Sequence, residues 1–158
     1  MATKQELIAG LEMTVAQAKR TTSFFAPGEW DWKRAGGWTP KEHYSHLATV
    51  SGMIPAMSAG IMNAPEDREM TEGMNIDQMN AQAVGAMAAM TPEQIMQAFE
   101  ANYAKLIDFV KSMPDDQLNA KRRFFSDPIP VSDILSNVTV VHAIHHVYEA
   151  FMRTGVPL

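Results

Sequence analysis

The chain reads Thr39-Pro40-Lys41-Glu42-His43-Tyr44-Ser45-His46-Leu47 at the point where a long apolar repeat begins. Thr39 can accept a hydrogen bond from the backbone of Glu42, and the Glu42 side chain can accept one in return from the backbone of Thr39, which makes a capping box. Proline suits the first helical position, because no partner for its missing N–H is needed there. This stretch therefore predicts a helix that begins at Pro40.

Similar start signals occur at three other places in the chain. Thr3 is followed by Glu6, Thr91 by Pro92 and Gln94, and a fourth start is expected at Ser132-Asp133. Apolar residues follow each of the four starts at a spacing of three or four: Leu7, Leu11, Val15 and Ala18; Leu47, Val50, Ile54, Met57 and Ile61; Ile95, Phe99, Leu106, Val110 and Met113; Ile134, Val138, Val141, Tyr148 and Met152. This spacing predicts four amphipathic helices.

The fold class follows from these four helices. No stretch alternates between apolar and polar residues as a half-buried strand does, and prolines or glycines follow the predicted helix ends. We expect an all-α protein, an up-down four-helix bundle that forms a single domain over residues 1–158. The connection between the second and third helices is too long for a bare loop. The helical spacing of Ile76, Met79, Ala83 and Met87 predicts a short extra helix within it.

Composition excludes several classes of protein. The 158 residues include 13 basic and 18 acidic side chains, a formal charge of −5 that argues against a nucleic-acid partner. With no cysteine, the chain has no disulfide, thiolate ligand or cysteine nucleophile. The longest apolar run, residues 48–62, falls short of the roughly 20 residues that cross a bilayer, so no membrane contact is expected. The amino terminus does not resemble a secretory signal, and we expect a cytoplasmic protein.

All five histidines fall in two of the predicted helices. His142 and His146 are four residues apart, so their side chains lie on one helical face and can reach a single metal ion. A third ligand from a neighbouring helix would be His43 or His46. Periodicity places His43 nearer the centre of the apolar stripe, but His43 can also pack on Trp38, which immediately precedes the cap. The residues alone do not decide between His43 and His46. They also leave open the ordinary interpretation, in which the histidines are polar surface residues.

Two motifs, taken in order, resemble those of the DinB-like superfamily. One runs from Trp38 to Leu47, with a tryptophan before the helix and a histidine-leucine pair within it, and the other is Val141-His142-Ala143-Ile144-His145-His146. The resemblance covers nearly the whole chain. It implies a four-helix bundle, often dimeric, with a divalent metal ion such as nickel or zinc. Carried over by position, the metal ligands would be His46, His142 and His146.

The resemblance also implies a class of chemistry. Related enzymes use low-molecular-weight thiols as co-substrates, so we expect a metal-dependent thiol S-transferase or hydrolase that acts on a small molecule, and a homodimer. Glu149 is a candidate base or a hydrogen-bond partner of a metal ligand. Where the family commonly has Arg-Gly-Gln, this chain has Val147-Tyr148-Glu149, which changes the pocket wall.

Two alternatives compete with the enzyme hypothesis. In the first, the protein is a non-catalytic metal-binding or dimerisation module, and the ion holds the bundle together. In the second, the 13 methionines form a thioether site for a soft ion, since Met53, Met57 and Met62 lie on one helix. Methionine is, however, an ordinary filler of protein cores.

Overall fold

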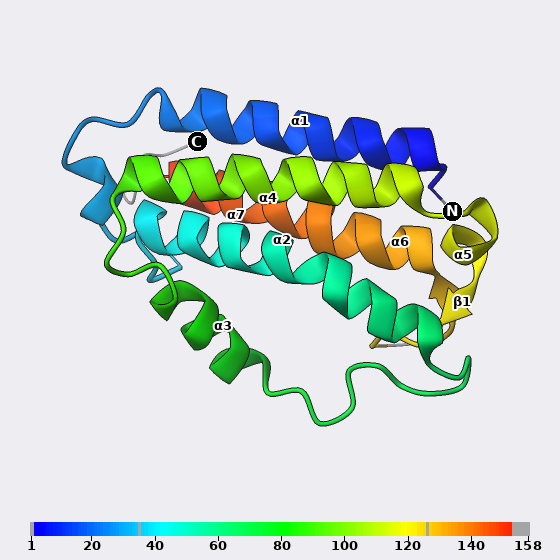
Figure 1. Ribbon diagram of the computed structural model, residues 1–158. Coiled ribbons are helices and arrows are strands. Elements are labelled where there is room, and N and C mark those ends of the chain that lie inside the picture. Colours follow the sequence, from blue (N-terminus) through cyan, green and yellow to red (C-terminus); the bar gives the residue numbers. More distant parts are fainter. Residues whose placement is uncertain (1, 35, 126, 153–158) are drawn as a thin grey trace.

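The computed structural model describes residues 2–34, 36–125 and 127–152. Four long helical rods lie side by side (Figure 1). Three of them are single α-helices, and the fourth is built from consecutive segments: α1 (Lys4–Thr22), α2 (Pro40–Asn63), α4 (Pro92–Ser112), and then α6 (Val131–Ser136), the π-helical segment η2 (Asn137–Val141) and α7 (His142–Phe151). The prediction of an all-α four-helix bundle is confirmed.

Shorter elements fill the connections between the rods. They are the 3-10 helix η1 (Glu29–Asp31), α3 (Ile76–Gly85), α5 (Asp115–Asn119) and the strands β1 (Lys121–Arg122) and β2 (Ile129–Pro130). The helix α3 is the short extra helix that the sequence predicts between the second and third long helices. The strands pair antiparallel, with Arg122 opposite Ile129. At two residues each, they are too short to leave a pattern of alternation in the sequence.

Helix starts agree with the sequence in three of four cases. Complete capping boxes form at Thr3, Thr39 and Thr91. The fourth start is wrong by one residue, because α6 begins at Val131 and has no side-chain cap. Its first backbone N–H, that of Val131, donates to the Ala120 carbonyl at 2.9 Å. The entry into this helix is therefore set by the chain segment beside it, which sequence spacing cannot reveal.

The four rods do not simply alternate in direction along the chain, and rods that follow each other in sequence are not always neighbours. The helices α1 and α2 each pack against both α4 and the η2–α7 rod, so α1 and α2 lie diagonally opposite each other. In Figure 1, α2 and α4 run in one direction, and α1 and α7 run in the other. The expected reversal of direction thus holds from α1 to α2 and from α4 to α7. The long connection that holds α3 returns the chain to its starting end, which makes α4 parallel to α2.

The apolar stripe of the fourth rod is also displaced from its predicted position. Val141 and Tyr148, which the sequence places in the core, are 59% and 53% exposed, whereas Ala143 and Val147 are buried. The cause is the π-helical segment η2, which has an i→i+5 hydrogen-bonding pattern and so takes extra residues per turn. A stripe extrapolated at 3.6 residues per turn across this segment therefore ends on the wrong face.

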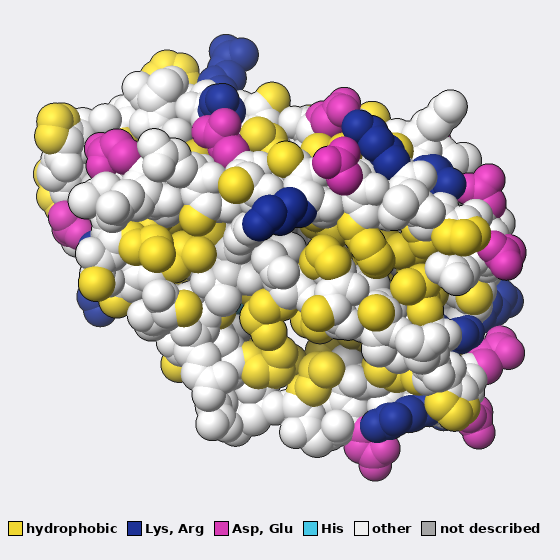
Figure 2. Space-filling model, in the orientation of Figure 1, with side chains coloured by type: hydrophobic (Ala, Val, Ile, Leu, Met, Phe, Trp, Pro, Cys, Tyr) yellow, Lys and Arg dark blue, Asp and Glu magenta, His cyan; other side chains and the backbone are white. Residues whose placement is uncertain are grey.

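Several of the described methionines behave as core filler. Met57, Met62, Met70, Met87 and Met96 are partly buried against the hydrophobic core. Figure 2 shows a hollow bordered by apolar side chains between α2 and the connection that holds α3. This packing favours the ordinary structural interpretation over a soft-metal site. Among the described residues, no helix combines the length and apolar character needed to cross a bilayer.

Candidate metal centre

Four histidines from two helices meet at one end of the bundle. His43 and His46 lie in the first turns of α2, where the capping box at Thr39 starts the helix, and both are 2% exposed. His142 and His146 lie one turn apart in α7. Because α2 packs against α7, side chains that are about 100 residues apart in the sequence come together.

Three of these rings direct their Nε2 atoms to one point. The Nε2 atom of His142 lies 3.2 Å from Nε2 of His46 and 3.0 Å from Nε2 of His146. Nitrogen ligands at metal distances of ~2.0–2.1 Å lie roughly 2.9–3.4 Å apart around one ion, which includes both separations. The set His46, His142 and His146, predicted by the family resemblance, could therefore hold one metal ion.

The second nitrogen of each of two of these rings lies beside an oxygen atom. Nδ1 of His142 donates to the Val138 carbonyl at 3.3 Å, and Nδ1 of His146 lies 3.0 Å from Oε2 of Glu149. Because a carbonyl oxygen can only accept, the His142 ring carries its proton on Nδ1. This tautomer leaves the lone pair of Nε2 free, as metal coordination requires.

The π-helical segment supplies one of these oxygen atoms. In an α-helix the Val138 carbonyl would accept from the backbone N–H of His142, four residues on. Here that N–H donates to the Asn137 carbonyl five residues back, and the Val138 carbonyl accepts from the His142 ring instead. The next carbonyl, that of Thr139, accepts from the Tyr103 hydroxyl at 2.8 Å. The segment thus frees backbone groups that orient the site, a role that no sequence signal indicated.

Trp38 covers one side of the histidine cluster. Its ring stacks on that of His146, with a centroid separation of 5.5 Å and an interplanar angle of 15°. The same ring lies 5.3 Å from the rings of both His43 and His46. The predicted contact between Trp38 and His43 is confirmed, but the tryptophan packs equally on the candidate ligands.

A buried ion pair fixes the loop that carries Trp38. The guanidinium of Arg34 lies 3.2 Å from the Glu29 carboxylate, and both side chains are 2% exposed. Nε of Arg34 also donates to the Ala150 carbonyl near the end of α7 at 2.8 Å. No sign of this pair appears in the sequence, because nothing in the local pattern distinguishes these residues from surface charges.

His43 belongs to a second group of converging atoms. Its Nδ1 atom lies 3.1 Å from Nδ1 of His146 and 3.8 Å from Oε2 of Glu149. These three residues form a further set that could hold a cation. His46 and His43 thus belong to different groups around His146: His46 lies with the converging Nε2 atoms, and His43 faces Nδ1 of the His146 ring.

His145 is separate from the candidate ligands. Its side chain is 61% exposed, and its Nε2 atom lies 3.2 Å from Oε1 of Glu149. It lies on the same exposed face as Val141 and Tyr148.

Burial keeps the clustered rings uncharged. The pKa of His43 and that of His46 are each lowered to about 4, mainly by loss of hydration and, for His46, also by the neighbouring His142 and His43. The pKa of His142 is also lowered by burial, although its bond to Val138 opposes the change. The pKa of His146 falls mainly by burial and then by the surrounding histidines. At neutral pH these rings can accept a metal ion without first losing a proton from Nε2.

Acid should destabilise the metal-free protein through these rings. The unfolded chain, with histidine pKa values near 6.5, binds more protons than the folded chain down to about pH 4. The contribution of these neutral rings to the free energy of unfolding is therefore fully present above pH 6.5 and is lost as the pH falls below that value. We expect the thermal midpoint, followed by circular dichroism, to drop by roughly 5 °C or more between pH 6.5 and pH 5. An unchanged midpoint would show that these rings are not buried and neutral.

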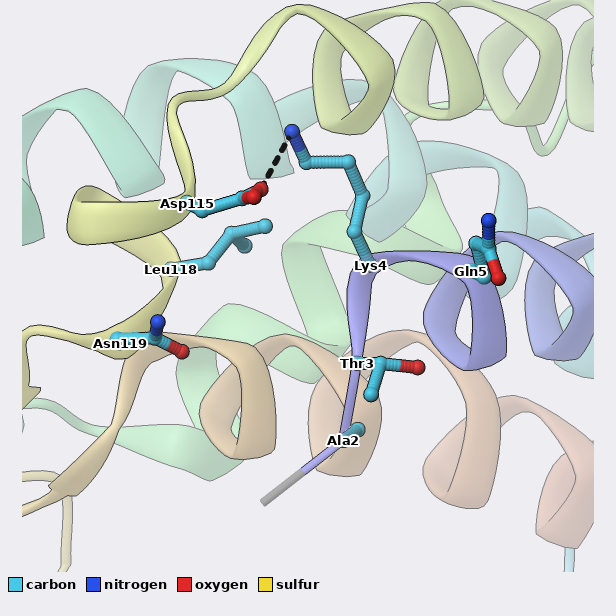
Figure 3. A pocket seen from close by; sticks show the side chains of 7 residues that line it. All are labelled: Ala2, Thr3, Lys4, Gln5, Asp115, Leu118 and Asn119. Carbon is cyan, nitrogen blue, oxygen red and sulfur yellow. Dashed lines mark ion pairs between the residues drawn. The ribbon is translucent and has the colours of Figure 1, made fainter.

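A further pocket lies away from the histidines. Figure 3 shows this cavity of about 440 Å³, lined by residues at the start of α1 and in α5: Ala2, Thr3, Lys4, Gln5, Asp115, Leu118 and Asn119. It is at the opposite end of the bundle from the histidines (Figure 1). Its charged side chains, Lys4 and Asp115, pair with each other at 2.8 Å. The converging ring nitrogens, rather than the size of a cavity, therefore identify the candidate site.

Comparisons with known proteins agree with this architecture. The family model of the DinB superfamily matches residues 4–150. One similar solved structure is YfiT from Bacillus subtilis, described as a probable metal-dependent hydrolase with an unusual four-helix bundle topology. It is 17% identical with a TM-score of 0.70, over 93% of this chain and 83% of its own. No match was found among curated proteins.

A second similar structure is that of a mycothiol-dependent maleylpyruvate isomerase, solved as a single-residue mutant in which alanine replaces a histidine. It is 15% identical with a TM-score of 0.67, over 90% of this chain and 60% of its own. At these identities, the two structures establish the shared fold.

Proposed function

The chain belongs to the DinB superfamily, and on that premise we propose that it is a metal-dependent enzyme acting on a small molecule. The ligands of the divalent ion are His46, His142 and His146. The reaction is hydrolysis or the transfer of a low-molecular-weight thiol, and the ion is nickel or zinc. The thiol comes from a second molecule, because the chain has no cysteine.

The convergence of three Nε2 atoms carries this proposal. Separations of 3.0 and 3.2 Å suit ligands of one ion. When each ring carries its proton on Nδ1, as metal coordination requires, the Nε2 lone pairs face the same point. A cation at this point satisfies all three lone pairs.

Three histidine ligands leave room for a further ligand, which distinguishes a catalytic metal site from a closed structural one. A bound divalent ion supplies Lewis-acid chemistry to a water or thiol at that position. The chain's own residues do the rest. The Val138 carbonyl holds the His142 ring proton away from the ion, the Glu149 carboxylate lies 3.0 Å from Nδ1 of His146, and Trp38 excludes water from one side. The side chains of His146 and Glu149, 13% and 28% exposed, mark the side from which a substrate approaches.

The similar structures support both classes of reaction as proposals. One is described as a probable metal-dependent hydrolase, and the other as mycothiol-dependent. Neither description extends to the substrate of this chain, whose Tyr148 and Glu149 replace the residues that the family commonly has there.

The test is a paired measurement of metal content and turnover. Protein purified without an affinity tag is analysed for metals, then assayed with ester and amide substrates and with thiol plus electrophile pairs. We expect turnover from the metal-loaded protein and none after chelation or in His142→Ala. Turnover that survives chelation would refute a metal-dependent mechanism.

A non-catalytic metal module is the second candidate. It is favoured by the 2% exposure of His46 and by the covering ring of Trp38. Bound metal that has no exchangeable water and supports no turnover would select it. The homodimer stays a prediction under either candidate.

A further inference from the structure

We propose that the hollow between α2 and the connection of residues 64–90 is a binding site for one linear alkyl chain with an uncharged or cationic head group (Figure 2). The site is separate from the metal centre and uses none of the histidines. Three observations support it: an uncharged stretch of α2 that is partly exposed, open space at Gly60, and a connection held to the bundle on both sides of the hollow.

The wall of the hollow is the second half of α2. From Leu47 to Asn63 this helix carries no charged side chain. The Thr49 hydroxyl donates to the carbonyl of Ala83 in α3 at 3.1 Å, which identifies the side of α2 that the connection covers. Residues four, seven and eleven positions after Thr49 share that side of the helix. They are Met53, Ala56 and Gly60, and all three are exposed.

Gly60 shows that the connection does not fill this side of α2. A Cβ atom at Gly60 would meet no packed neighbour within 4 Å. By contrast, a Cβ atom at Gly52, about two turns earlier on α2, would come within 2.8 Å of the Asn102 side chain in α4. In Figure 2, apolar side chains border the hollow. The connection therefore bridges this part of α2 without packing on it.

The connection is fixed to the bundle on both sides of the hollow. Beyond α3, Nζ of Lys41 in the first turn of α2 donates to the Ala88 carbonyl at 3.0 Å. Before α3, the backbone N–H of Met70 donates at 3.2 Å to the carbonyl of Arg123, which follows β1. Because both sides are held, the connection keeps a folded partner or a bilayer away from α2. The occupant must be slender, and an unbranched alkyl chain meets that requirement.

The side chains of the connection favour one class of head group. Arg68 is its single basic residue, and its acidic residues are Glu66, Asp67, Glu69, Glu72 and Asp77. This charge repels an anionic head group and attracts a cationic one. The connection also contains five methionines, at positions 70, 74, 79, 87 and 90. Methionine is flexible and polarizable, so it adapts to the surface of an apolar ligand.

The test is a titration of the protein with dodecyltrimethylammonium below its micellar concentration, followed by the methyl NMR signals of the methionines. One equivalent should shift the signal of Met53, which is 47% exposed, and leave that of Met13 on α1, which is 45% exposed, unchanged. Hexyltrimethylammonium should bind about 100-fold more weakly or worse, because each of its six missing methylenes contributes about fourfold when buried. His142→Ala should bind dodecyltrimethylammonium as the wild type does, so the result does not depend on the proposed metal site.

Gly60→Leu is the variant that fills the hollow. The leucine side chain occupies the open space, so the affinity for dodecyltrimethylammonium should fall about tenfold or more through the loss of contact with buried methylenes. The thermal midpoint should not fall, because leucine is favoured over glycine inside a helix. The matched control is Gly85→Leu, which also has open space at its Cβ position. Gly85 lies two residues after Ala83 on α3 and so faces away from α2, and this variant should bind as the wild type does.

Four results would overturn the proposal. Unchanged affinity in Gly60→Leu, or equal shifts of the Met13 and Met53 signals, would mean that the detergent adsorbs to the surface without a site. Equal affinities for the two chain lengths would mean that no alkyl chain is buried. A lower thermal midpoint in Gly60→Leu than in Gly85→Leu would mean that the connection packs on α2 and leaves no room for a ligand.

Discussion

His142→Ala and His146→Ala are each expected to abolish stoichiometric metal in the purified protein. Each substitution removes one of three converging Nε2 donors, and the two that remain cannot complete the set. Removal of a residue that only hydrogen-bonds to a metal ligand already weakens metal affinity by about 10–100-fold. Removal of a ligand itself should therefore weaken it by more than about 100-fold. The measurements are metal content by elemental analysis and Zn²⁺ affinity by competition with a chromogenic chelator.

His145→Ala is the matched control for these variants. It is on the same helix and next to His146, but its exposed ring points away from the converging nitrogens. His43→Ala should also retain one equivalent of metal, because its Nδ1 atom faces the other side of the His146 ring. Full metal content in His142→Ala or His146→Ala would show that the ion, if any, is bound elsewhere.

Arg34→Met is expected to cause the largest loss of stability among single substitutions at this end of the bundle. It removes the guanidinium that pairs with the buried Glu29 carboxylate, and with it the donor to the Ala150 carbonyl. Breaking a buried ion pair by removing one partner costs about 3–5 kcal/mol. For a chain of this size, that corresponds to a fall in thermal midpoint of about 10 °C. Urea unfolding measures the free energy directly.

Lys111→Met provides the comparison for Arg34→Met. Lys111 pairs with Asp108 at 3.9 Å, but both side chains are more than half exposed. Exposed pairs contribute about 0–1 kcal/mol, so this variant should unfold almost as the wild type does. If Arg34→Met costs no more than Lys111→Met, the ion pair does not fix the loop that carries Trp38.

The candidate site was only partly predictable from the sequence. The spacing of His142 and His146 predicted a shared helical face, and the structure confirms it. The choice between His43 and His46 could not be made from periodicity, because both are buried in α2 and both contact Trp38. It depends on which side of the His146 ring each residue faces, and that is set by the packing of α2 against α7.

By itself, the sequence determined the four long helices and three of their four starts, since capping and apolar spacing act among residues that are neighbours along the chain. Tertiary structure alone decided the order of the rods and which face of the fourth rod is buried after η2. It also decided the burial of Arg34 with Glu29. These features depend on contacts between residues distant in sequence. The free energy of such contacts comes from burial and from pairing buried polar groups, neither of which leaves a periodic trace in the chain.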